Sequence, residues 1–210
     1  MRLISEAWSA LKINDEPYVW LETAPGELIA EADARSLAEE FPAGSFVRKT
    51  TDGRKSDKSY RNYSRALAGP GAPDIGDLPV VWREFVSELL APAYREAVCA
   101  RLDLPAPGQL EVRLVRHVTG DWLGPHTDRA DKLFSHVFYF NEGWRQEWGG
   151  CLQILRSEDP ADVVHTVVPV LGASALMIRA DNSWHQVGEV HTRAGEPARH
   201  RTSLLVHGLR

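Results

Sequence analysis

The chain holds two histidines and an aspartate whose types and order suit a metal site. His126 and Asp128 are separated by one residue in GPHTD, and His185 follows much later in NSWHQV. Side chains alternate between the two faces of an extended strand, so His126 and Asp128 point the same way. An imidazole and a carboxylate then face a common point, and a second imidazole completes the ligand set. Such a set leaves three positions of an octahedral metal open, as in non-haem Fe(II) oxygenases.

An arginine near the end of the chain has the chemistry to bind a carboxylate. Arg201 lies in RHRTSLLVHG, and Ser203 shares its face of an extended strand because it is two residues away. A guanidinium pairs with a carboxylate through two parallel charge-assisted hydrogen bonds, to which a serine hydroxyl adds a donor. Arg199 has the same strand parity, so it remains an alternative to Arg201.

The segments around these residues have the pattern of short β-strands. The run QLEVRLVRHV (109–118) alternates between apolar and polar residues and precedes a turn at Gly120 and Asp121. Further short β-rich runs, punctuated by Gly, Pro and Asn, indicate an antiparallel sandwich or barrel. They span residues 135–141, 149–155, 163–170, 173–178 and 202–208.

Together these features resemble the 2-oxoglutarate/Fe(II)-dependent dioxygenases, especially their prolyl-4-hydroxylase-like branch. The resemblance runs from about residue 109 to residue 208. It rests on the H-x-D, an aromatic strand ending in Asn (VFYFN), a loop with Trp144, a Gly-Gly before a hydrophobic strand, a Trp-His and a terminal R-x-S. It implies a double-stranded β-helix, the cupin-like jelly roll, with His126, Asp128 and His185 on iron.

The resemblance also implies the roles of further residues. Arg201 is expected to pair with the distal carboxylate of 2-oxoglutarate. Tyr139 falls where a tyrosine often binds the same carboxylate, and His117 falls where the preceding strand commonly carries a tyrosine. Trp184, next to the distal histidine, is a candidate substrate contact. The implied cofactor is Fe(II), with 2-oxoglutarate and O₂ as co-substrates and ascorbate as reductant in vitro.

The first hundred residues are expected to support the β core. Apolar residues at helical spacing predict helices over 26–41, 80–90 and 93–102, and residues 16–24 read as an extra strand. We therefore expect a mainly β fold with flanking helices (α+β), in which N-terminal helices buttress the jelly roll. The expected organisation is a single domain over 1–210, with helical support and a lid segment in 1–108 and the β-helix core in 109–208.

Residues 44–76 show no clear periodicity, and a loop of that length in a compact domain is often an active-site lid, a binding loop or a linker. Basic residues outnumber acidic ones within it, although the chain as a whole is acidic. One reading is a solvated, mobile loop. The other is a lid whose Arg61 and Arg65 grip an anionic or carboxylate-bearing substrate.

The composition of the chain limits the kinds of molecule that it is expected to bind. The chain has 210 residues and a net charge of −5, which disfavours nucleic acid because phosphate binding needs clustered Lys and Arg in excess. No apolar run is long enough to span a bilayer and no signal segment opens the chain, so a cytoplasmic location is expected.

Cys99 and Cys151 read as buried thiols. The histidines not named above read as structural or solvated, without arranged partners: His136, His165, His191, His200 and His207.

The function favoured by the sequence is hydroxylation of an unactivated C–H bond of a small amino acid or amino-acid-derived acid, free or carrier-bound. A peptide or protein prolyl hydroxylase is the alternative enzyme. From other classes, a zinc hydrolase or a non-catalytic jelly-roll binding protein remains open, because two histidines and a carboxylate also suit Zn²⁺. An R-x-S carboxylate socket has no purpose in such a zinc site.

Overall fold

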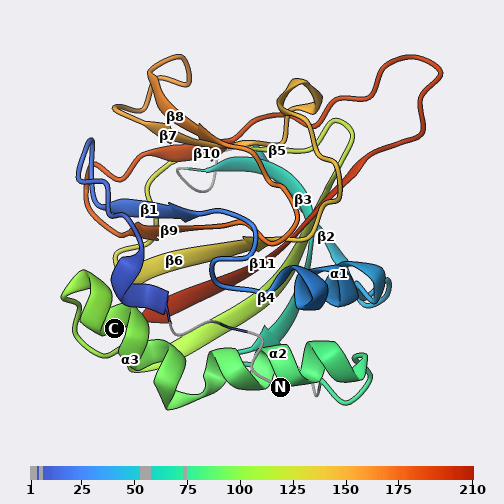
Figure 1. Cartoon of the computed structure of the whole chain (residues 1–210). Coiled ribbons are helices and arrows are strands. Elements are labelled where there is room, and N and C mark those ends of the chain that lie inside the picture. Colours follow the sequence, from blue (N-terminus) through green and yellow to red (C-terminus); the bar gives the residue numbers. More distant parts are fainter. Residues whose placement is uncertain (1–3, 5–6, 53–57, 73–74) are drawn as a thin grey trace.

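The computed structural model describes residues 4, 7–52, 58–72 and 75–210, and its strands form one antiparallel sheet that curls into an almost closed barrel (Figure 1). The strands are β1 (Trp20–Thr23), β2 (Val47–Asp52), β3 (Ser59–Ala68), β4 (Gln109–Val118), β5 (Trp122–His126), β6 (Lys132–Tyr139), β7 (Leu152–Leu155), β8 (Val163–Val167), β9 (Ser174–Ile178), β10 (His185–Val187) and β11 (His200–Leu209).

The strand order is β1-β9-β6-β11-β4-β3-β5-β10-β7-β8, with β2 paired to β3. In Figure 1 the strands β1, β9, β6, β11 and β4 form one wall of the barrel, and β5, β10, β7 and β8 form the facing wall. Strand β3 joins the walls, because its second half pairs with β4 while Tyr60 and Arg61 pair with β5. The jelly roll predicted from the sequence is therefore confirmed.

Alternation along the strands separates two apolar cores. Strand β6 is buried along its whole length. Its Phe134 and Phe138 join a large core between the first wall and the helices, whereas Val137 and Tyr139 point into the barrel and join a second core between the two walls. The side chains that line the inside of the barrel therefore come from alternate residues of rigid, doubly covered strands.

The expected helices flank the first wall. They are α1 (Glu31–Glu39), α2 (Val80–Leu90) and α3 (Pro92–Leu102), and in Figure 1 α2 and α3 lie beneath the sheet. Trp82 and Phe85 of α2 pack against Phe138 and Phe140. Helix α1 begins later than predicted: Gly26 lies in a turn with a positive φ of 86°, and Ala30 directly before the helix is still extended, with a ψ of 143°. No helix among the described residues is long and apolar enough to cross a membrane.

The prediction of an irregular loop over 44–76 is wrong for about half of its length. Residues 47–52 and 59–68 form strands β2 and β3, which pair with each other, and β3 continues the barrel sheet. Strand β2 is almost entirely exposed and β3 is mostly half-buried, so neither shows the apolar alternation of a strand with one buried face. The part of the predicted lid at 53–57 lies outside the described residues.

Candidate active site

Three buried side chains meet inside the barrel where β5 and β10 pair. His126 ends β5, Asp128 lies two residues beyond it, and His185 opens β10 opposite His126. Their exposed fractions are 3%, 8% and 5%, and one ligand atom from each lies within 4.8 Å of the others. The sequence prediction that these residues converge agrees with this placement.

Both histidines are oriented by carbonyl groups of their own segments. Nδ1 of His126 lies 2.9 Å from the carbonyl oxygen of Gly124, and Nδ1 of His185 lies 2.9 Å from that of Ser183. A carbonyl only accepts, so each Nδ1 carries the proton and donates it. Each Nε2 is then left with a lone pair, which is the arrangement that supporting hydrogen bonds give to metal-binding histidines.

The charge states also fit a metal ion. Burial lowers the pKa of both His126 and His185, so the rings are neutral near pH 7. Burial alone would raise the pKa of Asp128, but Lys132 and the other nearby bases hold it well below its ordinary value. Metal ligands must be neutral imidazole and ionised carboxylate, and this donor set suits Fe(II) with positions left for other ligands.

Asp128 is held by its own set of contacts. Its Oδ2 accepts a hydrogen bond from the Ser135 hydroxyl at 2.5 Å, and its Oδ1 accepts from the ammonium groups of Lys132 at 2.7 Å and Lys58 at 3.3 Å. Behind them, His207 lies 2.8 Å from Ser135 Oγ and 3.4 Å from Lys132 Nζ. The carboxylate is therefore bound at both oxygens.

A second polar cluster lies deeper in the barrel, around Arg201. In the β4–β11 pair Arg201 lies opposite His117, and its Nη1 donates to Nδ1 of His117 at 3.4 Å and to Oγ of Ser203 at 3.2 Å. The guanidinium carbon lies 5.1 Å from the centre of the Tyr139 ring. All four side chains are buried. They form a cationic socket, as the R-x-S motif predicts.

Three donors of this socket face no acceptor. Among the described residues, nothing accepts a hydrogen bond from Nε2 of His117, Oη of Tyr139 or Nε of Arg201. Burial lowers the pKa of His117 well below its ordinary value and raises that of Tyr139, so the first is neutral and the second protonated. Buried donors without acceptors are costly unless a ligand satisfies them. The cluster therefore has the positive charge and the unpaired donors that an anion would need.

The Gly-Gly of the sequence motif makes room for this arginine. Gly150 has a φ of 66°, and a Cβ there would lie 3.1 Å from Cδ of Arg201. At Gly149 a Cβ would lie 1.8 Å from the carbonyl oxygen of Glu189, which rules out any side chain. The absence of side chains at Gly149 and Gly150 therefore lets the backbone pack closely against Glu189 and Arg201.

The triad lines a cavity of about 800 Å³ together with Arg201 and His117 of the socket. Trp184, the candidate substrate contact, lines it together with Tyr60, Asn62 and Ser64 from β3. Apart from Arg201, the lining has an excess of cations over its two acids, Glu111 and Asp128. These cations are Lys49, Lys58, Arg113, Arg129, Lys132 and Arg179.

The two arginines predicted to contact substrate do not line this cavity. Arg65 is buried against Asp77 at 2.6 Å, and Arg61 stacks on Trp122. Both occupy odd positions of β3, whereas the cavity-facing residues of that strand are even-numbered, so the correction follows from alternation. Arg199 also lies elsewhere, paired with Glu196 at 2.6 Å, which leaves Arg201 as the socket arginine.

The sequence analysis missed residues of the cavity as well. His207, read as structural without a partner, lies on the cavity wall bound to Ser135 and Lys132. Counting in twos from Arg201 along β11 gives Ser203, residue 205 and His207, so the strand period already contained this signal. Two other histidines read the same way also have partners, since His136 bonds Tyr94 and Ser174 and His165 bonds Glu22.

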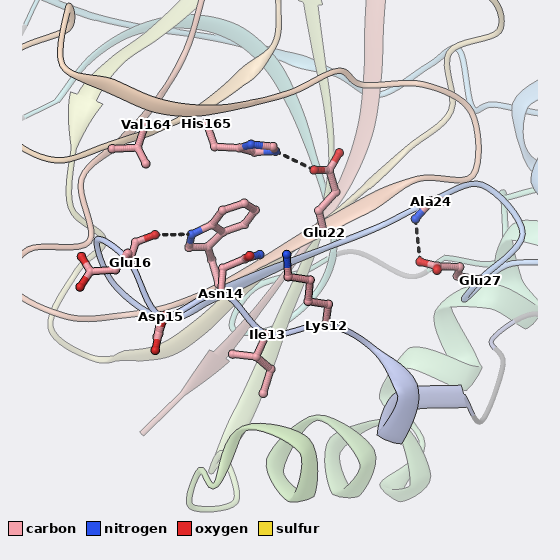
Figure 2. Close-up of a pocket in the computed structure, with 11 residues that line it drawn as sticks. Lys12, Ile13, Asn14, Asp15, Glu16, Glu22, Ala24, Glu27, Val164 and His165 are labelled. Carbon is pink, nitrogen blue, oxygen red and sulfur yellow. Dashed lines mark hydrogen bonds and ion pairs between the residues drawn. The ribbon is translucent and has the colours of Figure 1, made fainter.

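A second hollow of about 770 Å³ lies on the outside, where the edge strands β1 and β8 face each other (Figure 2). His165 and Glu22 meet across it at 2.8 Å, beside the Trp20 ring. Most of its charged side chains are acidic, and nothing there matches the buried triad, which is the one metal-ligand cluster within the described part of the chain. We assign no chemistry to this hollow.

Comparison with known proteins agrees with this geometry. Residues 112–204 match the model of the 2OG-Fe(II) oxygenase superfamily. No curated protein sequence matches the chain. Among solved structures, a Pseudomonas putida prolyl-4-hydroxylase is similar with a TM-score of 0.64 and 20% identity, over 91% of this chain and 92% of that one.

Two further structures share the fold. A 2OG-Fe(II) oxygenase family oxidoreductase from Burkholderia pseudomallei matches with a TM-score of 0.60 and 19% identity, over 90% of this chain and 84% of that one. A prolyl hydroxylase from Trichoplax adhaerens, solved with a hypoxia inducible factor peptide, matches with a TM-score of 0.64 and 12% identity, over 90% and 83%. At these identities the structural likeness shows the fold.

Proposed function

Because the chain belongs to the 2OG-Fe(II) oxygenase superfamily, and so uses Fe(II), 2-oxoglutarate and O₂, we propose that it hydroxylates an unactivated C–H bond of a small amino acid or amino-acid-derived substrate, free or carrier-bound. The observation that carries the site assignment is the pairing of a buried His-Asp-His triad with a buried arginine socket in one cavity.

In this proposal Nε2 of His126, Nε2 of His185 and a carboxylate oxygen of Asp128 hold the iron. Bound there, Fe(II) supplies the centre at which O₂ is reduced while 2-oxoglutarate is converted to succinate and CO₂. The chain's own contribution is to fix the three ligand atoms, through the carbonyl contacts of the histidines and the side-chain contacts of Asp128, and to surround them with buried residues that exclude bulk water.

The socket is proposed to bind the distal carboxylate of 2-oxoglutarate. Arg201 supplies the charge, and the unsatisfied donors on His117 and Tyr139 supply hydrogen bonds to the same oxygens. Ser203 holds the guanidinium from the side. Since burial makes unpaired donors costly, an anion gains binding energy there that water-exposed residues would not give.

The substrate is proposed to be anionic. The cations proposed to bind it are not Arg61 and Arg65, which the sequence indicated, but other residues that line the cavity. The cations that line the cavity outnumber its acids, and Arg113 and Lys49 reach it from the β4 and β2 side. A cavity of about 800 Å³ also suits a small ligand rather than a large folded surface. Trp184 remains the proposed apolar contact beside His185.

The decisive experiment is to incubate the protein with Fe(II), 2-oxoglutarate and ascorbate under air and to measure succinate, first alone and then with a library of small carboxylates and amino acids analysed by mass spectrometry. We expect succinate in every case and a product 16 Da heavier than one library member. Protein loaded with Zn²⁺ is the control, because zinc carries no redox chemistry. Absence of succinate from the Fe(II) protein would refute the proposal.

A peptide prolyl hydroxylase is the second candidate, favoured by the shared fold with two prolyl hydroxylases. Proline-containing peptides of neutral, acidic and basic composition belong in the same assay. Hydroxyproline in a peptide, with no product from any small acid, would make this the better assignment.

A further inference from the structure

We infer that Lys132, Ser135 and His207 are positioning residues that lock the Asp128 carboxylate in the orientation needed to bind the metal. They form a closed ring of hydrogen bonds with Asp128 on the floor of the cavity. The inference rests on the proposed metal site but is independent of which substrate the enzyme takes.

The protons of this ring can be assigned from its contacts. The Ser135 hydroxyl has one proton, and Asp128 Oδ2, at 2.5 Å, takes it because an ionised carboxylate only accepts. Ser135 Oγ must then accept from Nδ1 of His207 at 2.8 Å. Nε2 of His207 is left as an acceptor, and the Lys132 ammonium, 3.4 Å away, donates to it and to Asp128 Oδ1 at 2.7 Å. Each proton in the ring has one acceptor assigned, with no conflict.

The fold supplies this ring from rigid elements. Ser135 and His207 are directly paired across β6 and β11, and Lys132 begins β6. Asp128 itself lies between β5 and β6, in a segment that belongs to no strand. Because its backbone is not part of a ladder, its carboxylate needs support from side chains, and the ring provides it from two paired strands.

The ring binds both carboxylate oxygens, Oδ1 through Lys132 and Oδ2 through Ser135. A carboxylate bound at one oxygen can rotate about its Cβ–Cγ bond, whereas one bound at both is fixed. Contacts of this kind around metal ligands commonly contribute about 10- to 100-fold to metal affinity. The sheet thus presents Asp128 towards the two histidines before any ligand arrives, which reduces the ordering cost of metal binding.

The test compares Ser135→Val with Ser135→Thr. These side chains have the same shape, but only threonine keeps a hydroxyl for Asp128 and His207. His207→Phe removes both ring nitrogens and keeps an aromatic ring. Ser174→Ala is the matched control, because Ser174 binds His136 at 2.9 Å from the opposite face of β6 and is equally buried.

The readouts are the dissociation constant of Co²⁺ and its visible absorption spectrum, measured under anaerobic conditions on protein of verified fold. We expect Ser135→Val and His207→Phe to bind Co²⁺ about 10- to 100-fold more weakly, with a shifted spectrum, and Ser135→Thr and Ser174→Ala to match the wild type. Wild-type affinity and spectrum in both Ser135→Val and His207→Phe would overturn the ring. Equal binding by wild type and Asp128→Ala would instead overturn the metal site itself.

Discussion

Nη1 of Arg201 donates to Nδ1 of His117 across 3.4 Å, between residues that face each other in the β4–β11 pair. Since Nδ1 accepts, the neutral imidazole carries its proton on Nε2, the atom that has no partner among the described residues. One contact thus orients the arginine and sets the tautomer of the histidine. Both side chains then present donors to the same buried space.

The first prediction concerns this socket. In Arg201→Ala the carboxylate of 2-oxoglutarate loses a buried charged partner, a loss of about 2–5 kcal/mol, so its KM should rise roughly 30-fold or more. Arg201→Lys should fall in between, because lysine keeps the charge without the planar fork. Succinate formation at varied 2-oxoglutarate gives the KM, and the Fe(II) dissociation constant should stay near the wild-type value.

Arg199→Ala is the matched control, since Arg199 is bound to Glu196 and Trp148 outside the cavity. It should leave the KM for 2-oxoglutarate unchanged. A large rise in that KM for Arg199→Ala, with none for Arg201→Ala, would contradict the assignment of the socket arginine.

Much of the fold follows from strand periodicity, and its failures have a physical cause. The alternating run over 109–118 predicts β4 with its observed bounds, because one face of that strand is apolar and buried. Strands β2 and β3 escaped the same reasoning. The outer strand β2 is exposed on both faces, and β3 places Tyr60, Asn62 and Ser64 against a polar cavity instead of an apolar core.

The same distinction explains which site residues the sequence reveals. His126, Asp128 and Arg201 belong to short motifs in which two functional side chains sit two residues apart, so the local pattern indicates their chemistry. Lys132 and His207 lie 75 residues apart and meet only because β6 pairs with β11. A contact that depends on sheet register has no local signature: His207 shares the strand parity of Arg201, but Lys132 has the opposite parity to Ser135 and lies where the β6–β11 register shifts.

The second prediction tests the triad. His126→Ala, Asp128→Ala and His185→Ala should each abolish hydroxylation and weaken Fe(II) binding by more than about 100-fold, because losing a direct ligand costs more than losing a supporting contact. Anaerobic Fe(II) titration with a colorimetric chelator as competitor measures the affinity. Undiminished affinity in all three variants would mean that iron binds elsewhere.

The third prediction uses the buried pair of Lys132 and Asp128. Lys132→Met removes the ammonium 2.7 Å from the carboxylate and leaves the buried charge paired only with Lys58 at 3.3 Å, which should destabilise the protein by up to about 3–5 kcal/mol in EDTA. A divalent ion bound by Asp128 replaces the lost positive charge. Added Mn²⁺ or Co²⁺ should therefore raise the Tm of Lys132→Met by more than it raises the wild-type Tm.

Differential scanning fluorimetry with and without metal provides this comparison. Arg129→Met is the control, because Arg129 is half-exposed and pairs with the exposed Asp131. Equal metal-induced shifts in wild type and Lys132→Met would show that the ammonium and the metal do not share the carboxylate.

The last prediction concerns pH and His136, which has no hydrogen bond to Asp128 or Arg201 and is bonded instead to Tyr94 and Ser174. Burial lowers the pKa of His136 to about 3, and the ring is held between Tyr94 and Ser174. In the unfolded chain this histidine has an ordinary pKa near 6.5. Between these two values the unfolded state binds a proton that the folded state does not, so stability rises with pH and falls as the pH drops below about 6.5. The contribution of His136 to this slope is about 1.4 kcal/mol per pH unit.

His136→Gln keeps a donor and an acceptor for the two partners but cannot titrate. Urea unfolding between pH 6 and pH 5 should therefore give a slope smaller by about this amount in His136→Gln than in the wild type, whatever the variant's stability at pH 7. The other buried histidines contribute equally to both proteins, so an unchanged slope would mean that His136 is protonated in the folded state.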